Sequence, residues 1–234
     1  MKTKILAIAG LAISISAVEA SASILEDWEA PALPPNVVSA TLPAPWVRFS
    51  GPVNNIALVH DAGLGSFNQT EPLASPAGGN QYLFLVGTNT GISRLSGVAI
   101  EVDSTYTLQA AIGNPFGQIN THVWSLQLWA DADGSGAFEG SGSDTFIGQE
   151  FGTSLTATNA AIEEWALNSF SFNSATTPEL VGKQLIIFLN NFGDGSSSYD
   201  NVALVTPQPV PLPSTFWLLV PALGGLGAMR RRTV

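Results

Sequence analysis

The segment "DADGSGAFEGSGSD", residues 131–144, has residue types that could hold a cation. Short oxygen-bearing side chains recur at alternate positions and a glycine follows, as in the first half of a calcium-binding loop of the EF-hand kind. Gly142 stands where that loop requires a bidentate Glu, so Glu139 and Asp144 could compensate only in another geometry. The alternative, which the missing Glu favours, is a flexible Gly/Ser turn between two strands. The candidate ligands of this loop are Asp131, Asp133, Ser135 and Glu139.

Three tryptophans, Trp46, Trp129 and Trp165, could bind sugar rings, because strand parity or a Pro-rich context would leave them pointing outward. A flat aromatic ring attracts the apolar face of a sugar, and neighbouring Asn, Gln and Asp side chains would bind its hydroxyl groups. Most aromatic residues of proteins belong to the core, however, and a sandwich of this size needs large core side chains. A core role is therefore the alternative for each of the three.

Catalysis has little support in the sequence. His60 and His122 have no evident partner, and the chain contains no Gly-x-Ser-x-Gly, no His-Glu-x-x-His and no phosphate-binding loop. Glu163 and Glu164 are adjacent, so their side chains should point apart on a helix or a strand. The sequence predicts a protein that is not an enzyme, with a secreted hydrolase built on scattered residues as an alternative.

The composition suits an exported β protein. The chain of 234 residues has 18 acidic against 8 basic residues and a net charge of −10, so nucleic acid is excluded as a partner by charge repulsion. Cysteine is absent, which excludes disulfides and thiolate metal sites. Charged residues make up only 11% while the chain has 23 glycines and 15 prolines, as in turn-rich β proteins.

Short runs of alternating apolar residues predict the strands of one domain over residues 23–206. The segments "STYTLQAAIGN", residues 104–114, and "HVWSLQLWA", residues 122–130, each place apolar side chains at every second position. The run "QLIIFLN", residues 184–190, is apolar on both faces, which predicts a central, covered strand. A helical pattern occurs only around residues 160–167, and there weakly. The expected fold class is an all-β sandwich.

The order of these pieces resembles the galactose-binding-like jelly rolls of carbohydrate-binding modules. The matching segments are "DWEAPALPPN", "AGGNQYLFL", "VDSTYTLQAAIGNP" and "SYDNVALV". The resemblance implies a jelly-roll β-sandwich in which Glu29 and Asp200 share a structural Ca²⁺. Alternation also puts Asp200 on the side of Val202 and Leu204, which the sandwich would bury, and a buried carboxylate needs a partner. The alternative is that Asp200 begins its strand at a wet edge.

The two ends of the chain have the features of targeting segments. Residues 1–22 combine two lysines, an apolar stretch and small residues, which predicts a secretory signal peptide cleaved after Ala20 or Ala22. A buried N-terminal helix is the alternative. Residues 207–234 combine a Pro-rich linker, a short apolar block and an arginine triplet that would stay on the cytoplasmic side of a membrane. A C-terminal core element with a basic tail is the alternative there.

The C-terminal segment resembles the PEP-CTERM sorting signal of Gram-negative bacteria that produce exopolysaccharide, in its "VPLP" variant. Leu212 is a departure, because the family usually has Glu at that position. The residues of the predicted sorting motif, with Leu212 included, are Val210, Pro211, Leu212, Pro213, Arg230, Arg231 and Arg232.

The resemblance implies export, transient anchoring in the inner membrane and processing by an exosortase-type enzyme. The expected destination is the cell surface or the extracellular polysaccharide matrix. Together these patterns predict an exported, non-enzymatic structural or adhesive protein that binds glycan, with extracellular polysaccharide as a partner and Ca²⁺ as a structural ion. A dedicated carbohydrate-binding module is the alternative beside the hydrolase.

Overall fold

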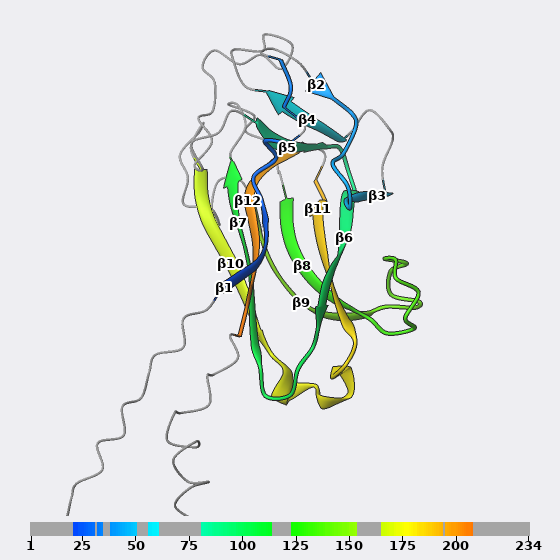
Figure 1. The fold of residues 1–234 in the computed structure, drawn as a ribbon. Helices are drawn as coiled ribbons and strands as arrows, with labels where there is room; N and C mark the ends of the chain where they lie inside the picture. The colour runs from blue at the N-terminus through cyan, green and yellow to red at the C-terminus, as the bar shows by residue number, and fades with distance from the viewer. Residues whose placement is uncertain are drawn as a thin grey trace, which may run out of the picture. The chain divides into compact units, whose positions relative to one another are not determined.

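In the residues that it describes, the computed structural model shows an all-β sandwich with two short 3-10 helices (Figure 1). In this part of the chain no helix is long and apolar enough to cross a membrane. Most of the predicted signal peptide and the sorting segment lie outside the described residues. The structure describes residues 21–30, 32–34, 38–50, 56–60, 81–113, 123–153, 165–193 and 195–207.

One sheet has seven antiparallel strands in the order β10-β7-β12-β5-β4-β2, with β1 paired to β12 beside this path. Non-consecutive strands are neighbours throughout its centre, as in a jelly roll. Its strands are β1 (Ser21–Glu26), β2 (Val38–Ser39), β4 (Ile56–His60), β5 (Gln81–Val86), β7 (Thr105–Gly113), β10 (Trp165–Asn173) and β12 (Ser196–Thr206).

The second sheet has five antiparallel strands in the order β3-β6-β11-β8-β9. The two sheets face each other, and the connection between β8 and β9 projects to the right in Figure 1. The strands are β3 (Val47–Ser50), β6 (Thr90–Ala99), β8 (Val123–Asp131), β9 (Thr145–Thr153) and β11 (Gln184–Asn191), and the 3-10 helices are η3 (Ser174–Thr176) and η4 (Pro178–Leu180).

The core lies between the sheets, and the predicted alternation decides which side chains enter it. Every second residue of β7 and β8 belongs to one buried cluster, as the sequence predicts. Strand β11 is central in its sheet and buried on both faces from Leu185 to Asn191, which confirms the covered strand. The core residues of the three strands are Tyr106, Leu108, Ala110, Ile112, Trp124, Leu126, Leu128, Ala130, Leu185, Ile187 and Leu189.

The prediction of a helix around residues 160–167 is wrong for the last three of these residues. Trp165 begins strand β10, which pairs in unbroken register with β7 as far as Asn173. Residues 160–164 lie outside the described part of the chain. The pairing with β7 overrides the local pattern, because an edge strand is held by its ladder more than by intrinsic propensity.

Candidate functional site

Four strands of the seven-stranded sheet bring together a row of side chains on the face turned away from the core. Ser198 pairs with Phe84 on one side and with Gly113 on the other, and Gly113 pairs with Trp165. The intervening residues of β5, β7 and β12 belong to the core, so alternation turns this row outward. The row runs across strands β5, β12, β7 and β10.

A second row lies next to the first and contains a carboxylate. Asp200 pairs with Ala111, and Ala111 pairs with Leu167. On the other side of β12, Tyr199 pairs with Leu83, so the next residues along the two strands, Asp200 and Tyr82, are neighbours. The side chain of Asp200 is 0% exposed although it points away from the core.

A β-bulge gives Asp200 this outward direction. The pairing of β12 with β7 shifts between Asp200 and Ala203, and Asn201 has a φ of 50°. The backbone N–H of Asn201 donates a hydrogen bond to Asp200 Oδ1 at 2.7 Å. The extra residue reverses parity, since Tyr199 and Val202 both face the core. The prediction that Asp200 shares a side with Val202 and Leu204 is therefore wrong, although its burial is confirmed.

Aromatic rings lie on the same outward face as Asp200. Tyr82 and Phe84 form a buried cluster separate from the core, with Val86 and Trp165 packed against it. The rings of Tyr82 and Trp165 meet edge to face, with centroids 5.6 Å apart. The outward face of β5, β12, β7 and β10 thus combines a buried carboxylate with aromatic rings at one end of the sheet.

Two polar atoms of this face lack hydrogen-bond partners. Among the described residues, Ser198 Oγ and Trp165 Nε1 are both buried and unpaired. Buried polar atoms in native proteins are nearly always hydrogen-bonded, so each exception calls for an explanation such as a ligand. We call the set Tyr82, Phe84, Trp165, Ser198 and Asp200 the acid–aromatic site.

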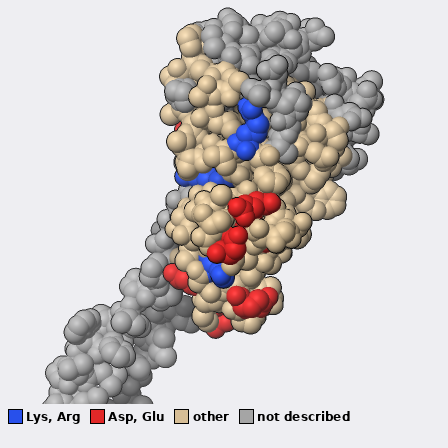
Figure 2. Space-filling model, turned by 90° about the vertical axis from the view of Figure 1, so that its right-hand side faces the viewer, with Lys and Arg blue, Asp and Glu red and all other residues tan. Residues whose placement is uncertain are grey.

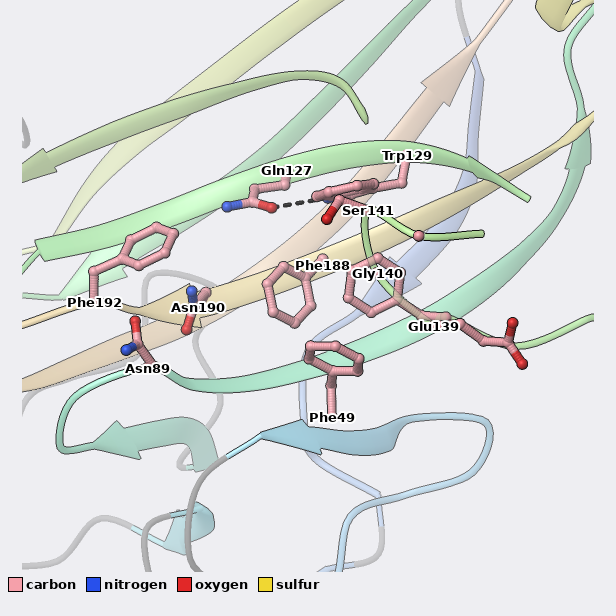
Figure 3. Close-up of a pocket in the computed structure, with 12 residues that line it drawn as sticks. Phe49, Asn89, Gln127, Trp129, Glu139, Gly140, Ser141, Phe188, Asn190 and Phe192 are labelled. Atoms are coloured by element: carbon pink, nitrogen blue, oxygen red, sulfur yellow. Dashed lines mark hydrogen bonds between the residues drawn. The ribbon is translucent and has the colours of Figure 1, made fainter. Parts of the chain in front are cut away.

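A separate pocket of about 490 Å³ lies on the outward face of the five-stranded sheet. Its floor carries Phe188 and Asn190 from β11, and Phe49 from β3 stands at its side (Figure 3). Trp129 Nε1 donates a hydrogen bond to Gln127 Oε1 at 2.8 Å, which fixes the indole ring along one wall. The β8–β9 loop supplies a further wall. The remaining lining residues are Asn89, Phe138, Glu139, Gly140, Ser141, Gly142 and Phe192.

The three candidate tryptophans occupy three different environments. Trp46 is 4% exposed and belongs to the core, where its Nε1 donates to Glu26 Oε2 at 3.1 Å. Trp129 is half-buried in the pocket of the five-stranded sheet. Trp165 belongs to the acid–aromatic site. The structure therefore does not bring the three together into one platform.

The first candidate calcium pair lies at the start of β5. Glu29 Oε1 accepts a hydrogen bond from the backbone N–H of Gln81 at 2.8 Å. Asp200 lies beside Tyr82, the next residue of the same strand. Calcium at this pair stays a prediction.

The second candidate set is only partly assembled as expected. Ligand atoms of Asp131 and Asp133 lie within 4.8 Å of each other and of Asp144, a group of carboxylates that leaves out Glu139. Strand β8 ends at Asp131 and β9 begins at Thr145, so the connection between the strands holds all three carboxylates in place.

The structure does not describe the side chains of the residues weighed for catalysis. His60 ends strand β4, and its side chain is outside the description. His122, Glu163 and Glu164 lie outside the described residues, as do the sorting residues 210–213 and 230–232.

Sequence reasoning missed most of the acid–aromatic site. No catalytic motif marks Tyr82, Phe84 or Ser198, and more than 100 residues separate β5 from β12. One signal was present: "QYLFLV", residues 81–86, is apolar at nearly every position, which predicts a strand covered on both faces. A covered outward face is what the structure shows.

Comparison with known proteins identifies the family of this chain. A family model described as HpiC1-like, HpiC1 cyclase, matches residues 23–205. No curated protein matches the chain in sequence. Two crystal structures of a cyclase from Fischerella sp., one of them an apo form, resemble it with a TM-score of 0.59 and 15% identity. The alignments cover 82% of this chain and 98% and 100% of those chains.

Other solved structures resemble the chain more loosely. A CBM22-1 xylan-binding domain from Paenibacillus barcinonensis Xyn10C has a TM-score of 0.47 and 10% identity, over 83% of this chain and 100% of that one. At such identities the likeness concerns the fold. The match to the family model is of another kind, because it rests on sequence over most of the chain. This match overturns the prediction of a non-enzymatic structural or adhesive protein, because the description of the family names a cyclase, which is an enzyme.

Proposed function

The chain belongs to the HpiC1-like cyclase family, and we propose on this premise that it is a cyclase that closes a ring in a small, unsaturated, largely apolar substrate. The acid–aromatic site is the proposed reaction site. The observation that carries this choice is Asp200, a carboxylate with no exposed surface that points away from the core among aromatic rings. A fully buried carboxylate on the outward face of a sheet is a candidate acid or base for catalysis.

The proposed reaction needs only a proton donor that also takes the proton back. The carboxylic acid of Asp200 adds its proton to a carbon–carbon double bond of the substrate, which leaves a carbocation. A second double bond or an arene of the same molecule attacks this carbon, and a new carbon–carbon bond closes the ring. Loss of a proton to the Asp200 carboxylate restores the double bond or the arene, so product and substrate are isomers and no oxidant is needed.

The rings around Asp200 suit a cationic intermediate. The faces of aromatic rings attract cations, most strongly when water is absent, and Tyr82 and Trp165 meet in this site. Water would capture a carbocation before the ring closed, and burial of the site excludes it. The unpaired Ser198 Oγ and Trp165 Nε1 supply two donors that orient a polar group of the substrate.

A turnover experiment tests this proposal. The full-length protein is incubated with a panel of arenes that carry an isoprenoid-like diene side chain, and products are identified by mass spectrometry and NMR. We expect an isomer of unchanged mass with one double bond fewer, and one deuterium in the new C–H bond when the reaction runs in D₂O. Asp200→Asn keeps the acceptor for the Asn201 N–H but has no acidic proton, so turnover should fall about 10²–10⁴-fold.

The matched control is Asp103→Asn, because Asp103 is exposed and its φ of 51° is tolerated by Asn. We expect wild-type turnover from this variant. Full activity of Asp200→Asn would move the reaction away from the acid–aromatic site, and the aromatic pocket of the other sheet would be the next candidate. Absence of any isomer across the panel would count against cyclase activity on this substrate class.

We also propose that the enzyme is exported and sorted by an exosortase-type system. The supporting features are the signal-peptide pattern of residues 1–22 and the tripartite pattern of residues 207–234. Mass spectrometry of the exported protein tests this route. A mature C-terminus that still carries residues 230–234 would contradict processing.

A further inference from the structure

The pocket on the outward face of the five-stranded sheet, which we call the aromatic pocket, has no part in the proposed reaction. Its volume of about 490 Å³ lies within the range of about 300–1,000 Å³ that is usual for small-molecule sites. Trp129 of β8 and Phe49 of β3 stand on opposite sides of it, because strands β11 and β6 separate β8 from β3 (Figure 3). Phe138 of the β8–β9 loop contacts both rings, with centroids 5.1 Å from Trp129 and 4.5 Å from Phe49. The pocket therefore has flat apolar walls.

The floor of the aromatic pocket depends on a position without a side chain. Gly91 of β6 pairs with Asn190 of β11. A Cβ atom at Gly91 would come 2.6 Å from Cζ of Phe188, so only glycine lets this ring lie over β6. Phe188 packs in turn against Phe138 at 4.7 Å and edge to face against Phe49 at 5.5 Å, measured between ring centroids. The rings thus hold one another in place before any ligand binds, which lowers the entropy cost of binding.

A glutamine fixes the orientation of the Trp129 ring. Gln127 Oε1 accepts the hydrogen bond of the indole N–H, while its Nε2 donates to Ser125 Oγ and to Gln149 Oε1, both at 3.1 Å. The amide of Gln127 is thereby used within the sheet, so its role is to hold the indole. Trp129 itself is only half-buried, which leaves part of its ring open to a ligand.

Asn190 brings a polar group without a partner to the floor. Its neighbour Leu189 belongs to the core, so alternation turns Asn190 outward, and Figure 3 shows its amide between Phe188 and Phe192. The residue is 4% exposed, and among the described residues its Oδ1 is buried and unpaired. Rotation of the amide about its last bond would turn Oδ1 toward a ligand. A hydrogen-bond donor of that ligand would then satisfy an acceptor that the protein leaves unpaired.

Charge restricts the class of ligand. Glu139 is the one charged residue among those that line the aromatic pocket, and its carboxylate points away from the rings in Figure 3. Figure 2 looks onto the side from which the β8–β9 loop projects in Figure 1, and several acidic side chains gather there. An anionic ligand would be repelled on this side of the molecule. A purely apolar ligand would leave Asn190 Oδ1 unpaired at a cost. The ligand that fits is uncharged and carries hydrogen-bond donors.

Aromatic surface continues beyond the pocket on the edge strand β9. Phe146 pairs with Trp129, and their ring centroids are 5.0 Å apart. Phe151 pairs with Ser125, and the two rings of β9 are 46% and 58% exposed. Their partners on β8 point outward, so both rings lie on the same face as the pocket. A linear ligand that leaves the pocket would meet further aromatic rings along β9.

We propose that the aromatic pocket binds one sugar unit of a neutral polysaccharide whose chain continues over β9. The C–H groups of a pyranose ring pack on the Trp129 indole, and a sugar hydroxyl donates to Asn190 Oδ1. Of the three tryptophans weighed for sugar binding, only Trp129 has this role. The acid–aromatic site lies on the other sheet, so this inference is independent of the proposed cyclase activity.

Calorimetry of the full-length protein tests the site. The protein is titrated with β-1,4-linked hexasaccharides of glucose, xylose and mannose, with D-glucose, and with hexagalacturonate as the anionic probe. We expect binding of at least one neutral hexasaccharide, and about tenfold weaker binding of D-glucose and of the anion. Trp129→Ala should weaken binding about tenfold or more, because the platform is lost. Asn190→Ala should weaken it about 3–10-fold through the loss of one hydrogen bond.

The controls separate loss of the site from loss of the fold. Asn190→Ala removes an unsatisfied buried atom, so its melting temperature should equal or exceed that of wild type. It decides the question if Trp129→Ala does not fold. Val102→Ala, in the exposed turn between β6 and β7, should bind as wild type does.

Three results would overturn the proposal. The first is the absence of binding to every neutral hexasaccharide, and the second is wild-type affinity in Asn190→Ala or in folded Trp129→Ala. The third is binding of D-glucose or hexagalacturonate as tight as that of the neutral hexasaccharides, which would contradict a neutral chain as the ligand. Because binding and not turnover is measured, each of these results leaves the proposed cyclase activity unaffected.

Discussion

The indole ring of Trp165 lies directly against Gly113. A Cβ atom at Gly113 would come 3.0 Å from two ring carbons of Trp165 and 3.1 Å from Ser198 Cβ. These distances are tighter than ordinary van der Waals contact, so a larger residue at this position would push the ring away. Gly113 therefore lets Trp165 approach the sheet beside Ser198 and sets the shape of the acid–aromatic site.

The variant Gly113→Ala tests this relationship. Displacement of Trp165 should lower the free energy of unfolding by about 1–3 kcal/mol, the usual effect of overpacking, and should reduce turnover. Urea unfolding and the isomerisation assay measure the two effects. Gly142→Ala is the control for stability, because nothing lies within 4 Å of a Cβ there. Wild-type turnover by Gly113→Ala would mean that the position of Trp165 is unimportant for the reaction.

The hydroxyl of Ser198 offers a second test, because it is buried without a partner. Removal of an unsatisfied buried polar atom lifts its desolvation penalty, so Ser198→Ala should leave the free energy of unfolding unchanged or raise it by about 1 kcal/mol. If the hydroxyl binds substrate, turnover should fall at the same time. Chemical unfolding together with the turnover assay measures both changes.

The neighbouring Ser197 provides the matched control for that variant. Its hydroxyl, equally buried, donates to Asn191 Oδ1 at 2.7 Å. Ser197→Ala leaves this acceptor with one partner fewer and should cost about 1–3 kcal/mol. A loss of stability in Ser198→Ala as large as in Ser197→Ala would show that Ser198 Oγ does have a partner in the folded protein.

The sequence predicts the sandwich because strand parity is a local property. In residues 105–113 and 123–129, the apolar side chains at every second position point into the core, and the side chains between them point outward. The same rule fails at Asp200, where the bulge at Asn201 inserts one residue. Nothing in "YDNVALV" marks that insertion, since Asn also occurs in regular strands, so the local pattern assigns Asp200 to the wrong face.

The acid–aromatic site depends on strand register, which the sequence alone does not provide. Its residues come from three strands that pair only in the folded sheet. The carboxylates of the β8–β9 loop are different, because they lie within 14 consecutive positions and their spacing already indicates a cation site. Even there, local spacing favours Glu139, whereas the fold brings Asp144 to the cluster.

Glu26 holds two side chains at the edge of the core, and its variants should separate the two roles. Glu26 Oε2 accepts from Trp46 Nε1 at 3.1 Å and from Arg94 Nη1 at 3.3 Å, while the guanidinium carbon of Arg94 lies 5.8 Å from the Trp46 ring centroid. Glu26→Ala removes both contacts and should cost about 1–3 kcal/mol. Glu26→Gln keeps an acceptor for Trp46 and should cost less. Equal unfolding midpoints for the two variants would contradict a role for the Trp46 hydrogen bond.

Tyr199 links the two sheets through its buried hydroxyl and should make the fold sensitive to alkali. The hydroxyl donates to the carbonyl oxygen of Asn190 at 2.7 Å, and that of Ser125 lies 3.4 Å away. Burial raises the pKa of Tyr199 well above its usual range. Above a pH of about 10 the unfolded chain releases this proton while the folded protein keeps it, so stability is full below pH 10 and falls as the pH rises.

The variant Tyr199→Phe should therefore change the pH dependence as well as the stability. At pH 8 we expect a cost of about 1 kcal/mol from the lost hydrogen bond. Between pH 10 and pH 11 the wild type should lose about 1 kcal/mol more than the variant, because the variant lacks the proton that the unfolded wild type releases. A shallower slope remains in Tyr199→Phe, since burial also raises the pKa of Tyr106. Urea unfolding at pH 8, 10 and 11 measures these slopes, and identical slopes in both proteins would show that Tyr199 is not the group responsible.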